Sequence, residues 1–133
     1  ELEAAGITVI PAVNQMEVSP VMYRTETIKF FTDKGIVISA SKALHRGASI
    51  DKEPIVDIAR KHSISPARVM LRWGLQKGLA IATKTSSSQR MKENRRLLTF
   101  TLDKDDLALL DGMTTKEDIA NRAELEKTRK TSM

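Results

Sequence analysis

The chain has 133 residues, of which 41% are hydrophobic and 29% are charged. It is long enough for one domain with a core, and shorter than the roughly 250 residues of a complete eight-stranded α/β barrel. No apolar run approaches the roughly 20 residues of a membrane span, and the lack of cysteine excludes disulfides and thiolate chemistry within it. The net charge of +5 favours an anionic partner, while an aromatic content of 4% argues against nucleic acid.

The first third of the chain predicts a β-α-β unit. Residues 1–6 read as the end of a helix that Gly6 terminates, so we expect the chain to begin within a fold. The apolar run 9–15 ends in polar residues, as a buried parallel strand does where it opens onto a site. A helix is predicted over 22–34, followed by a second buried strand over 35–41. This order implies a right-handed parallel crossover.

Two helices and a third strand are predicted next. The first helix covers 51–62, and the second covers 65–78, with Ser65 as its N-cap and a proline in its first turn. The strand over 79–83 ends in a polar loop that leads into a helix near Ser88. The amino terminus of that helix could hold an anion.

The last predicted helix begins at the N-cap Asp103 and ends at Gly112. Beyond it, residues 114–133 alternate acids and bases with few apolar side chains. This segment can be a solvated helix, a docking segment or a mobile tail. Three parallel strands with helices between them define an α/β fold, and the pattern alone fits half of a barrel or part of a doubly wound sheet.

Four spaced segments decide between these two folds. They read PAVNQMEVSP at 11–20, GIVISA at 35–40 and ARVMLRW at 67–73, followed by Lys84-Thr85 with Arg90, Glu93 and Asn94. In this order and without large gaps, the chain resembles the aldo-keto reductases. The resemblance implies the C-terminal portion of a (β/α)8 TIM barrel. Residues 1–113 would be a partial barrel matching the sixth to eighth strands, and 114–133 a charged C-terminal tail.

The resemblance also implies NADP(H) as cofactor, held across the C-terminal mouth of the barrel. The residues at the family's cofactor positions are Gln15, Ser41, Lys42, Leu44, Lys84, Thr85, Arg90, Glu93 and Asn94. Gln15 would bind the nicotinamide carboxamide, because an amide both donates and accepts hydrogen bonds. Lys84 and Thr85 would clamp the adenosine 2′-phosphate, with Arg90 on the phosphate or stacked on adenine. Glu93 and Asn94 would contact the adenine edge.

Several of these residues also have an ordinary structural interpretation. Gln15 can be a polar strand terminus, and Arg90 can be a solvated helix residue. The sequence has Ser41 where the family has a tyrosine that stacks on the nicotinamide, which removes on the order of 1 kcal/mol of positioning contacts. Lys42 replaces a hydroxyl near the pyrophosphate, and it can compensate by charge or be a basic surface residue.

No catalytic residue is predicted in this chain, because the family's catalytic aspartate, tyrosine, lysine and histidine belong to the first half of the barrel. The only tyrosine, Tyr23, lies on a predicted helix, where packing is the simpler role. His45 and His62 are isolated in the sequence and predict no metal site. Asp105 and Asp106 resemble helix N-terminal charges rather than an acid and base pair. Trp73 is predicted to lie in the core.

Two functions of different classes follow. In the first, this is the NADP(H)-binding half of an aldo-keto reductase-like oxidoreductase that reduces aldehydes or ketones and is inactive without an N-terminal half. In the second, it is a non-catalytic aldo-keto reductase-like subunit of a larger assembly, in which a protein partner covers the open strand edges and apolar inner face that three strands leave. We expect a cytoplasmic location, with an organelle interior left open.

Overall fold

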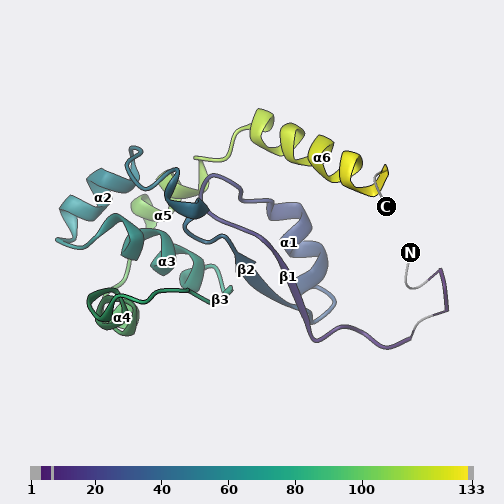
Figure 1. The fold of residues 1–133 in the computed structure, drawn as a ribbon, viewed down its shortest axis with the longest axis horizontal. Helices are drawn as coiled ribbons and strands as arrows, with labels where there is room; N and C mark the ends of the chain where they lie inside the picture. Colours follow the sequence, from purple (N-terminus) through teal and green to yellow (C-terminus); the bar gives the residue numbers. More distant parts are fainter. Residues whose placement is uncertain (1–3, 7, 132–133) are drawn as a thin grey trace.

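The computed structural model describes residues 4–6 and 8–131, without the side chains of residues 126 and 129–131. The elements in chain order are β1 (Val13–Glu17), α1 (Thr25–Thr32), β2 (Val37–Ser41), η1 (His45–Gly47), α2 (Ile55–Lys61), α3 (Pro66–Gln76), β3 (Ala80–Ile81), α4 (Ser88–Arg95), η2 (Leu97–Thr99), α5 (Lys104–Asp111) and α6 (Lys116–Thr131). Figure 1 shows α1 beside β1 and β2, with α2, α3 and α5 gathered on the other side. None of the described helices is long and apolar enough to cross a membrane.

The strands form one parallel sheet in the order β1-β2-β3. Gln15 pairs with Ser39 and Glu17 pairs with Ser41, so the first two strands are in register along their whole length. β3 joins the sheet only through its pairs at Ala80 and Ile81. The parallel α/β class predicted from the sequence is therefore confirmed.

The first strand lies further along the chain than the predicted range 9–15. It begins at Val13, because Pro11 has no N–H to give to a sheet ladder, and Val9 and Ile10 are 79% and 64% exposed. It ends at Glu17 rather than at Gln15, because Glu17 pairs with Ser41 of β2. β3 is shorter than the predicted range 79–83, since β2 is its only neighbour.

The predicted helices are present, and two of them begin later than expected. α1 starts at Thr25 rather than at Met22, because Met22 forms an antiparallel bridge with Ser19. α2 starts at Ile55 rather than near residue 51, since the residue before Pro54 is kept out of the helical region. Of the helix end predicted at residues 1–6, a turn at 4–6 is seen, and the remainder lies outside the described residues.

The other predicted helices keep their expected starts. α3 has Ser65 at its N-cap position, but this hydroxyl makes no capping bond. Ser87 caps α4 by accepting a hydrogen bond from the backbone N–H of Arg90. α5 begins with a full capping box between Asp103 and Asp106, as the sequence predicted.

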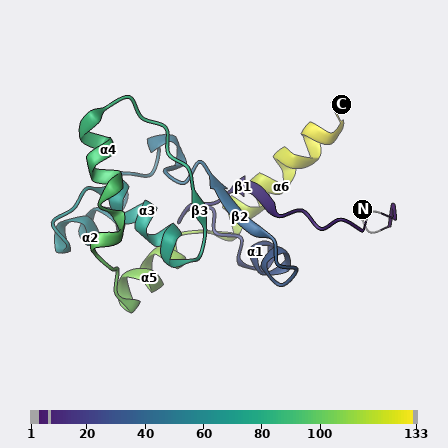
Figure 2. The same cartoon turned by 90° about the horizontal axis from the view of Figure 1, so that it is seen from below.

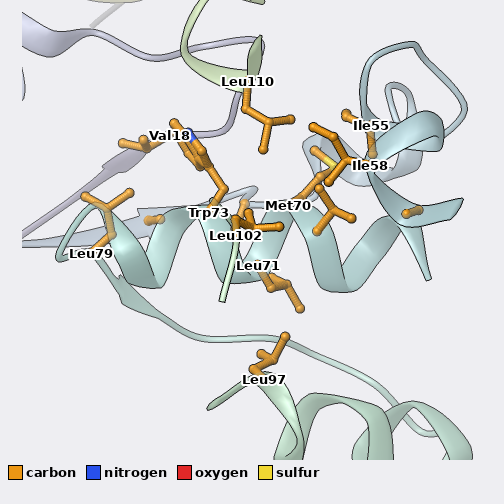
Figure 3. Packing of buried hydrophobic residues seen from close by; sticks show 14 of the residues in the cluster. Val18, Ile55, Ile58, Met70, Leu71, Trp73, Leu79, Leu97, Leu102 and Leu110 are labelled. Atoms are coloured by element: carbon orange, nitrogen blue, oxygen red, sulfur yellow. The ribbon is translucent and has the colours of Figure 1, made fainter. Parts of the chain in front are cut away.

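The core lies around α3, as Figure 3 shows. Met70 and Trp73 face α2 and α5, where Ile55 and Leu110 meet them, and all four side chains are at most 1% exposed. On the opposite side of α3, Leu71 points toward η2. The prediction that Trp73 is a core residue is confirmed. Because both sides of α3 are buried, this helix fixes β3 and α4 relative to the rest of the fold.

The contact between α3 and β3 depends on a glycine. Gly74 is buried in the middle of α3, and a Cβ atom added to it would lie 2.7 Å from Cδ1 of Ile81. Such a distance is shorter than any ordinary carbon contact. The missing side chain at Gly74 therefore lets β3 approach the helix closely, which sets the position of the loop that follows β3.

Candidate cofactor-binding site

The sheet has one apolar face and one mixed face at its C-terminal end. Ile38 and Ala40 of β2 are buried toward the helices. Because side chains alternate along a strand, Ser39 and Ser41 point to the opposite face, together with their neighbour Gln15 of β1. Gln15 is exposed there, so its amide is accessible to a ligand. This is the face that the sequence predicts to line the mouth of a barrel.

Glu17 is the residue of this face that sequence reasoning missed. Its side chain is buried, and its Oε2 atom accepts hydrogen bonds from Nζ of Lys42 at 2.6 Å and from Nη1 of Arg122 at 2.7 Å. Burial raises the pKa of Glu17, but the hydrogen bond and charge of Lys42 and the charge of Arg122 outweigh burial and hold this pKa below its usual value. The carboxyl group is therefore ionised at neutral pH. The sequence signal that could have identified Glu17 is its position two residues after Gln15, because residues two apart on a strand share one face.

The loop after β2 holds a strained conformation beside Glu17. Lys42, His45 and Arg46 have φ angles of 53°, 46° and 55°, in a region that costs non-glycine residues on the order of 1 kcal/mol each. His45 is not isolated, since its Nδ1 lies 2.6 Å from Oγ of the buried Ser49. The strain places the Lys42 ammonium against Glu17 rather than in solvent. Such outliers persist where surrounding contacts fix them, often at binding sites.

The other residues predicted in this region differ in their burial and contacts. Ser41 is partly buried at the end of β2, and no aromatic ring of the described residues takes the place of the tyrosine that the family has there. Leu44 packs against the core cluster and presents part of its surface to solvent. The ammonium of Lys42 forms an ion pair with Glu17 in this structure.

The second half of the candidate site surrounds the start of α4. The hydroxyl oxygen of Thr85 accepts a hydrogen bond from the backbone N–H of Ser87 at 3.1 Å, which shapes the loop between β3 and α4. Lys84 and Arg90 are exposed on either side of this turn. Within the described residues, neither cation has an acidic partner. Together with the N-terminal N–H groups of α4, they form an environment suited to a phosphate.

Glu93 and Asn94 lie one turn further along α4 and face different neighbours. Nδ2 of Asn94 donates to Oγ1 of Thr83 at 3.1 Å, so this amide lies against the loop that carries Lys84. Glu93 accepts from Nε2 of Gln89 at 3.1 Å, on the side of the helix that faces α3. Figure 2 shows α4 near α3, joined to β3 by the loop over residues 82–87.

The structure thus places the predicted residues in two groups. Gln15, Ser41 and Lys42 lie at the C-terminal ends of β1 and β2, and the remaining polar residues surround the start of α4. Among the described side chains, we find no hydrogen bond or ion pair that joins the two groups. A ligand that uses both must therefore be extended, with a phosphate end at α4 and a second polar end at the mouth of the sheet.

A third polar cluster joins α2 to α5 and has a structural role. Nε2 of His62 lies 2.6 Å from Oδ2 of Asp106, so the prediction that this histidine is isolated was wrong. Groups of His62, Asp103 and Asp106 come within 4.8 Å of one another, as metal ligands do. However, Nζ of Lys61 contacts both carboxylates, at 2.6 Å and 2.8 Å. This ammonium already neutralises the charge that would attract a cation.

The remaining sequence predictions concern Tyr23 and the acids of α5. The ring of Tyr23 packs edge-on against Trp73 with 5.0 Å between centroids, and burial raises its pKa. The predicted packing role of this tyrosine is confirmed, but Tyr23 precedes α1, which begins at Thr25, so its predicted position on a helix was wrong. Asp106 serves the helix terminus as predicted, because it completes the capping box of α5.

These features define the protein class. A parallel sheet with helices between its strands, polar residues at the strand ends and a basic loop before a helix define an α/β protein, and the arrangement fits part of an α/β barrel. Comparison with known proteins gives the family. The sequence model of the "Aldo/keto reductase family" matches residues 2–114, and the chain belongs to this family.

Curated relatives include two yeast enzymes. The chain is 30% identical over 115 residues to the aldehyde reductase YPR1 of Saccharomyces cerevisiae, covering 85% of this chain and 36% of that protein. It is 32% identical over 118 residues to the glycerol 2-dehydrogenase (NADP(+)) of the same yeast, covering 87% and 37%. The chain thus spans little more than a third of the length of these relatives.

Solved structures agree with the family assignment. A mutant of Gox0644 in complex with NADPH superposes with a TM-score of 0.82 at 34% identity, covering 88% of this chain and 42% of that one. An aldo/keto reductase from Brucella melitensis gives a TM-score of 0.75 at 28% identity, covering 84% and 42%. The three strands and their helices therefore correspond to a portion of the (β/α)8 barrel of these reductases.

Proposed function

We propose that this chain binds NADP(H) and forms the cofactor side of an aldo-keto reductase-like oxidoreductase that reduces aldehydes or ketones. The observation that carries the proposal is the pair Lys84 and Arg90, which flank the start of α4 without an acidic partner among the described residues. Two unpaired cations beside free helix N–H groups favour a phosphate. The similar proteins support the same cofactor, since one relative is an NADP(+)-dependent glycerol 2-dehydrogenase and one similar structure is a complex with NADPH.

The residues around α4 fit the adenosine end of this cofactor. Lys84 and Thr85 would hold the 2′-phosphate by charge and by a hydroxyl, and the planar group of Arg90 would bind phosphate or stack on adenine. Asn94, already oriented by its bond to Thr83, would contact the adenine edge. Glu93 would have to give up its contact with Gln89 to do the same.

At the mouth of the sheet, the chain would orient the nicotinamide end. Bound NADPH supplies the hydride for a carbonyl carbon. The exposed amide of Gln15 can both donate to and accept from the carboxamide, and Leu44 offers apolar surface in the neighbouring loop. Ser41 offers a hydroxyl and no ring, so the nicotinamide would be held less firmly than by an aromatic side chain.

We propose that the proton donor comes from a part of the reductase other than these described residues. Tyr23 is the only tyrosine of the chain, and its packing against Trp73 with a raised pKa suits a core residue. His62 is bonded to Asp106 in the polar cluster that joins α2 to α5. The side chains of Val13 and Val37, 54% and 47% exposed on the open face of the sheet, would be covered by the same completing part. We keep the cytoplasm as the proposed compartment, because a cysteine-free chain suits reducing conditions.

Calorimetric titration with NADPH and NADH tests this function. We expect micromolar binding of NADPH, weaker binding of NADH because it lacks the 2′-phosphate, and a loss of about tenfold or more for Arg90→Ala. Arg95→Ala is the matched control, since this arginine lies on the same helix and points about 140° away from Arg90. Equal effects of the two substitutions, or no binding by the folded chain, would contradict the proposal.

The alternative function is a non-catalytic aldo-keto reductase-like subunit of a larger assembly. Ser41 favours it, since the position that would stack on the nicotinamide has lost its ring. This alternative predicts a stable complex with another protein and no turnover of any aldehyde, even when the chain is joined to a catalytic half. Reduction of a simple aldehyde by the completed barrel would exclude it.

A further inference from the structure

The helix α6 lies outside the part of the chain that matches the family. The family match ends at residue 114, and α6 covers Lys116–Thr131. Its start is fixed by Thr114, whose hydroxyl donates to the backbone oxygen of Pro20 at 2.8 Å and accepts from the backbone N–H of Tyr23 at 2.6 Å. Figure 1 shows α6 extending along the side of the molecule where β1 and α1 lie. The family framework therefore does not account for what α6 does.

The apolar residues of α6 do not hold it against the body of the protein. Ile119 is 42% exposed and Leu125 is 60% exposed. In contrast, the side chain of Arg122 is only 19% exposed, because it reaches the buried carboxylate of Glu17. The capping bond between Thr115 and Asp118 stabilises the first turn of α6 itself. The ion pair with Glu17 connects the middle of α6 to the mouth of the sheet.

Glu17 shares one oxygen atom between two cations. Both Nζ of Lys42 and Nη1 of Arg122 bond to Oε2, at 2.6 Å and 2.7 Å. A buried carboxylate that loses its only cationic partner is left with an uncompensated charge, which is strongly unfavourable. A carboxylate that keeps a second cation can release the first at a lower free-energy cost. Lys42 follows Ser41 at the end of β2, and its side chain is 33% exposed compared with 19% for Arg122, so its ammonium is the more accessible to a ligand.

We propose that Arg122 is a positioning residue for cofactor binding, because by holding Glu17 it allows Lys42 to leave this carboxylate and bind the pyrophosphate of NADP(H). This inference rests on the proposed cofactor function. Arg122 itself does not touch the cofactor in this arrangement. It stabilises the ionised Glu17 while Lys42 is engaged elsewhere, so α6 and the cofactor favour each other's binding.

The first test compares two ligands that differ in the pyrophosphate. Arg122→Ala should weaken binding of NADPH by about fivefold, and should leave binding of adenosine 2′,5′-bisphosphate, which lacks the pyrophosphate, unchanged. Arg122→Lys should restore most of the NADPH affinity, since a lysine can also pair with Glu17. Lys116→Ala is the control on the same helix. Circular dichroism of each variant checks that the fold is intact.

The second test is a double-mutant cycle with Glu17→Gln. The neutral amide no longer holds Lys42, so in that background Arg122→Ala should change NADPH affinity by less than about twofold. An equal loss in both backgrounds, or an equal loss for the bisphosphate, would overturn the role of Arg122 while leaving the cofactor function in place. If the unaltered, folded chain does not bind NADPH, the proposed function fails, and this role of Arg122 fails with it.

Discussion

The imidazole of His62 bonds to the carboxylate of Asp106, with 2.6 Å between Nε2 and Oδ2, and this contact joins the end of α2 to the start of α5. Asp106 is only 2% exposed and also accepts the backbone N–H of Asp103 in the capping box. Both of these contacts are made by Oδ2, and Oδ1 accepts a hydrogen bond from Nζ of Lys61 at 2.8 Å. Asp106 thus forms a polar connection between α2 and α5.

Removing the Asp106 carboxylate should destabilise the fold. Asp106→Ala leaves the ring of His62 and the ammonium of Lys61 without their common partner and breaks the cap of α5, so we expect a loss of about 2–4 kcal/mol in the free energy of unfolding. Asp105→Ala is the control, because that neighbour is exposed. It should change stability by less than about 0.5 kcal/mol. Urea unfolding followed by circular dichroism measures both.

The same cluster should make stability depend on pH in the acid range. The hydrogen bond from Lys61 lowers the pKa of Asp103 from 3.8 to about 2. A carboxyl group with a lowered folded-state pKa contributes stability above its unfolded-state pKa and loses it as the pH falls through the folded value. Stability should therefore decrease between about pH 4 and pH 2. Lys61→Met should flatten this decrease, and an unchanged slope in that variant would show that other acids dominate.

Substitutions at Gly74 test how α3 sets the position of β3. Gly74→Ala adds a carbon near the end of the flexible Ile81 side chain, which can turn away, so we expect a change within about 1 kcal/mol. Gly74→Val adds more volume than rotation can relieve and should cost about 2 kcal/mol. Ile81→Ala should recover part of that loss. Thermal unfolding of the single and double variants measures the coupling between the two residues.

Ser41→Tyr tests whether this position faces the nicotinamide. If it does, a ring at the end of β2 adds stacking contacts worth about 1 kcal/mol, and NADPH binding should tighten about fivefold. Binding of adenosine 2′,5′-bisphosphate, which has no nicotinamide, should not change. Weaker binding of both ligands would mean that the ring obstructs the mouth of the sheet. Fluorescence titration of NADPH gives the first affinity, and calorimetry gives the second.

The sequence predicted where three residues of the proposed site lie relative to the strands and helices. Lys84 and Thr85 are in the loop between β3 and α4, and Arg90 is in the first turn of α4, as their short spacing along the chain predicts. The helix predicted to start near Ser88 begins at that residue, with Ser87 as its N-cap. The start of β1 was missed because hydrophobicity marks Val9 and Ile10 as strand residues, whereas Pro11 keeps them out of the hydrogen-bonded ladder.

The sequence by itself determined the order of strands and helices and the core position of Trp73, because periodicity, caps and short motifs are encoded between residues close in the chain. The cofactor positions stay a proposal that rests on the family resemblance. Only the tertiary structure showed that His62 meets Asp106, and that Lys42 and Arg122 share Glu17. These partners lie 44, 25 and 105 residues apart. A charged side chain pairs with whichever opposite charge the fold brings near, and no local pattern specifies that partner.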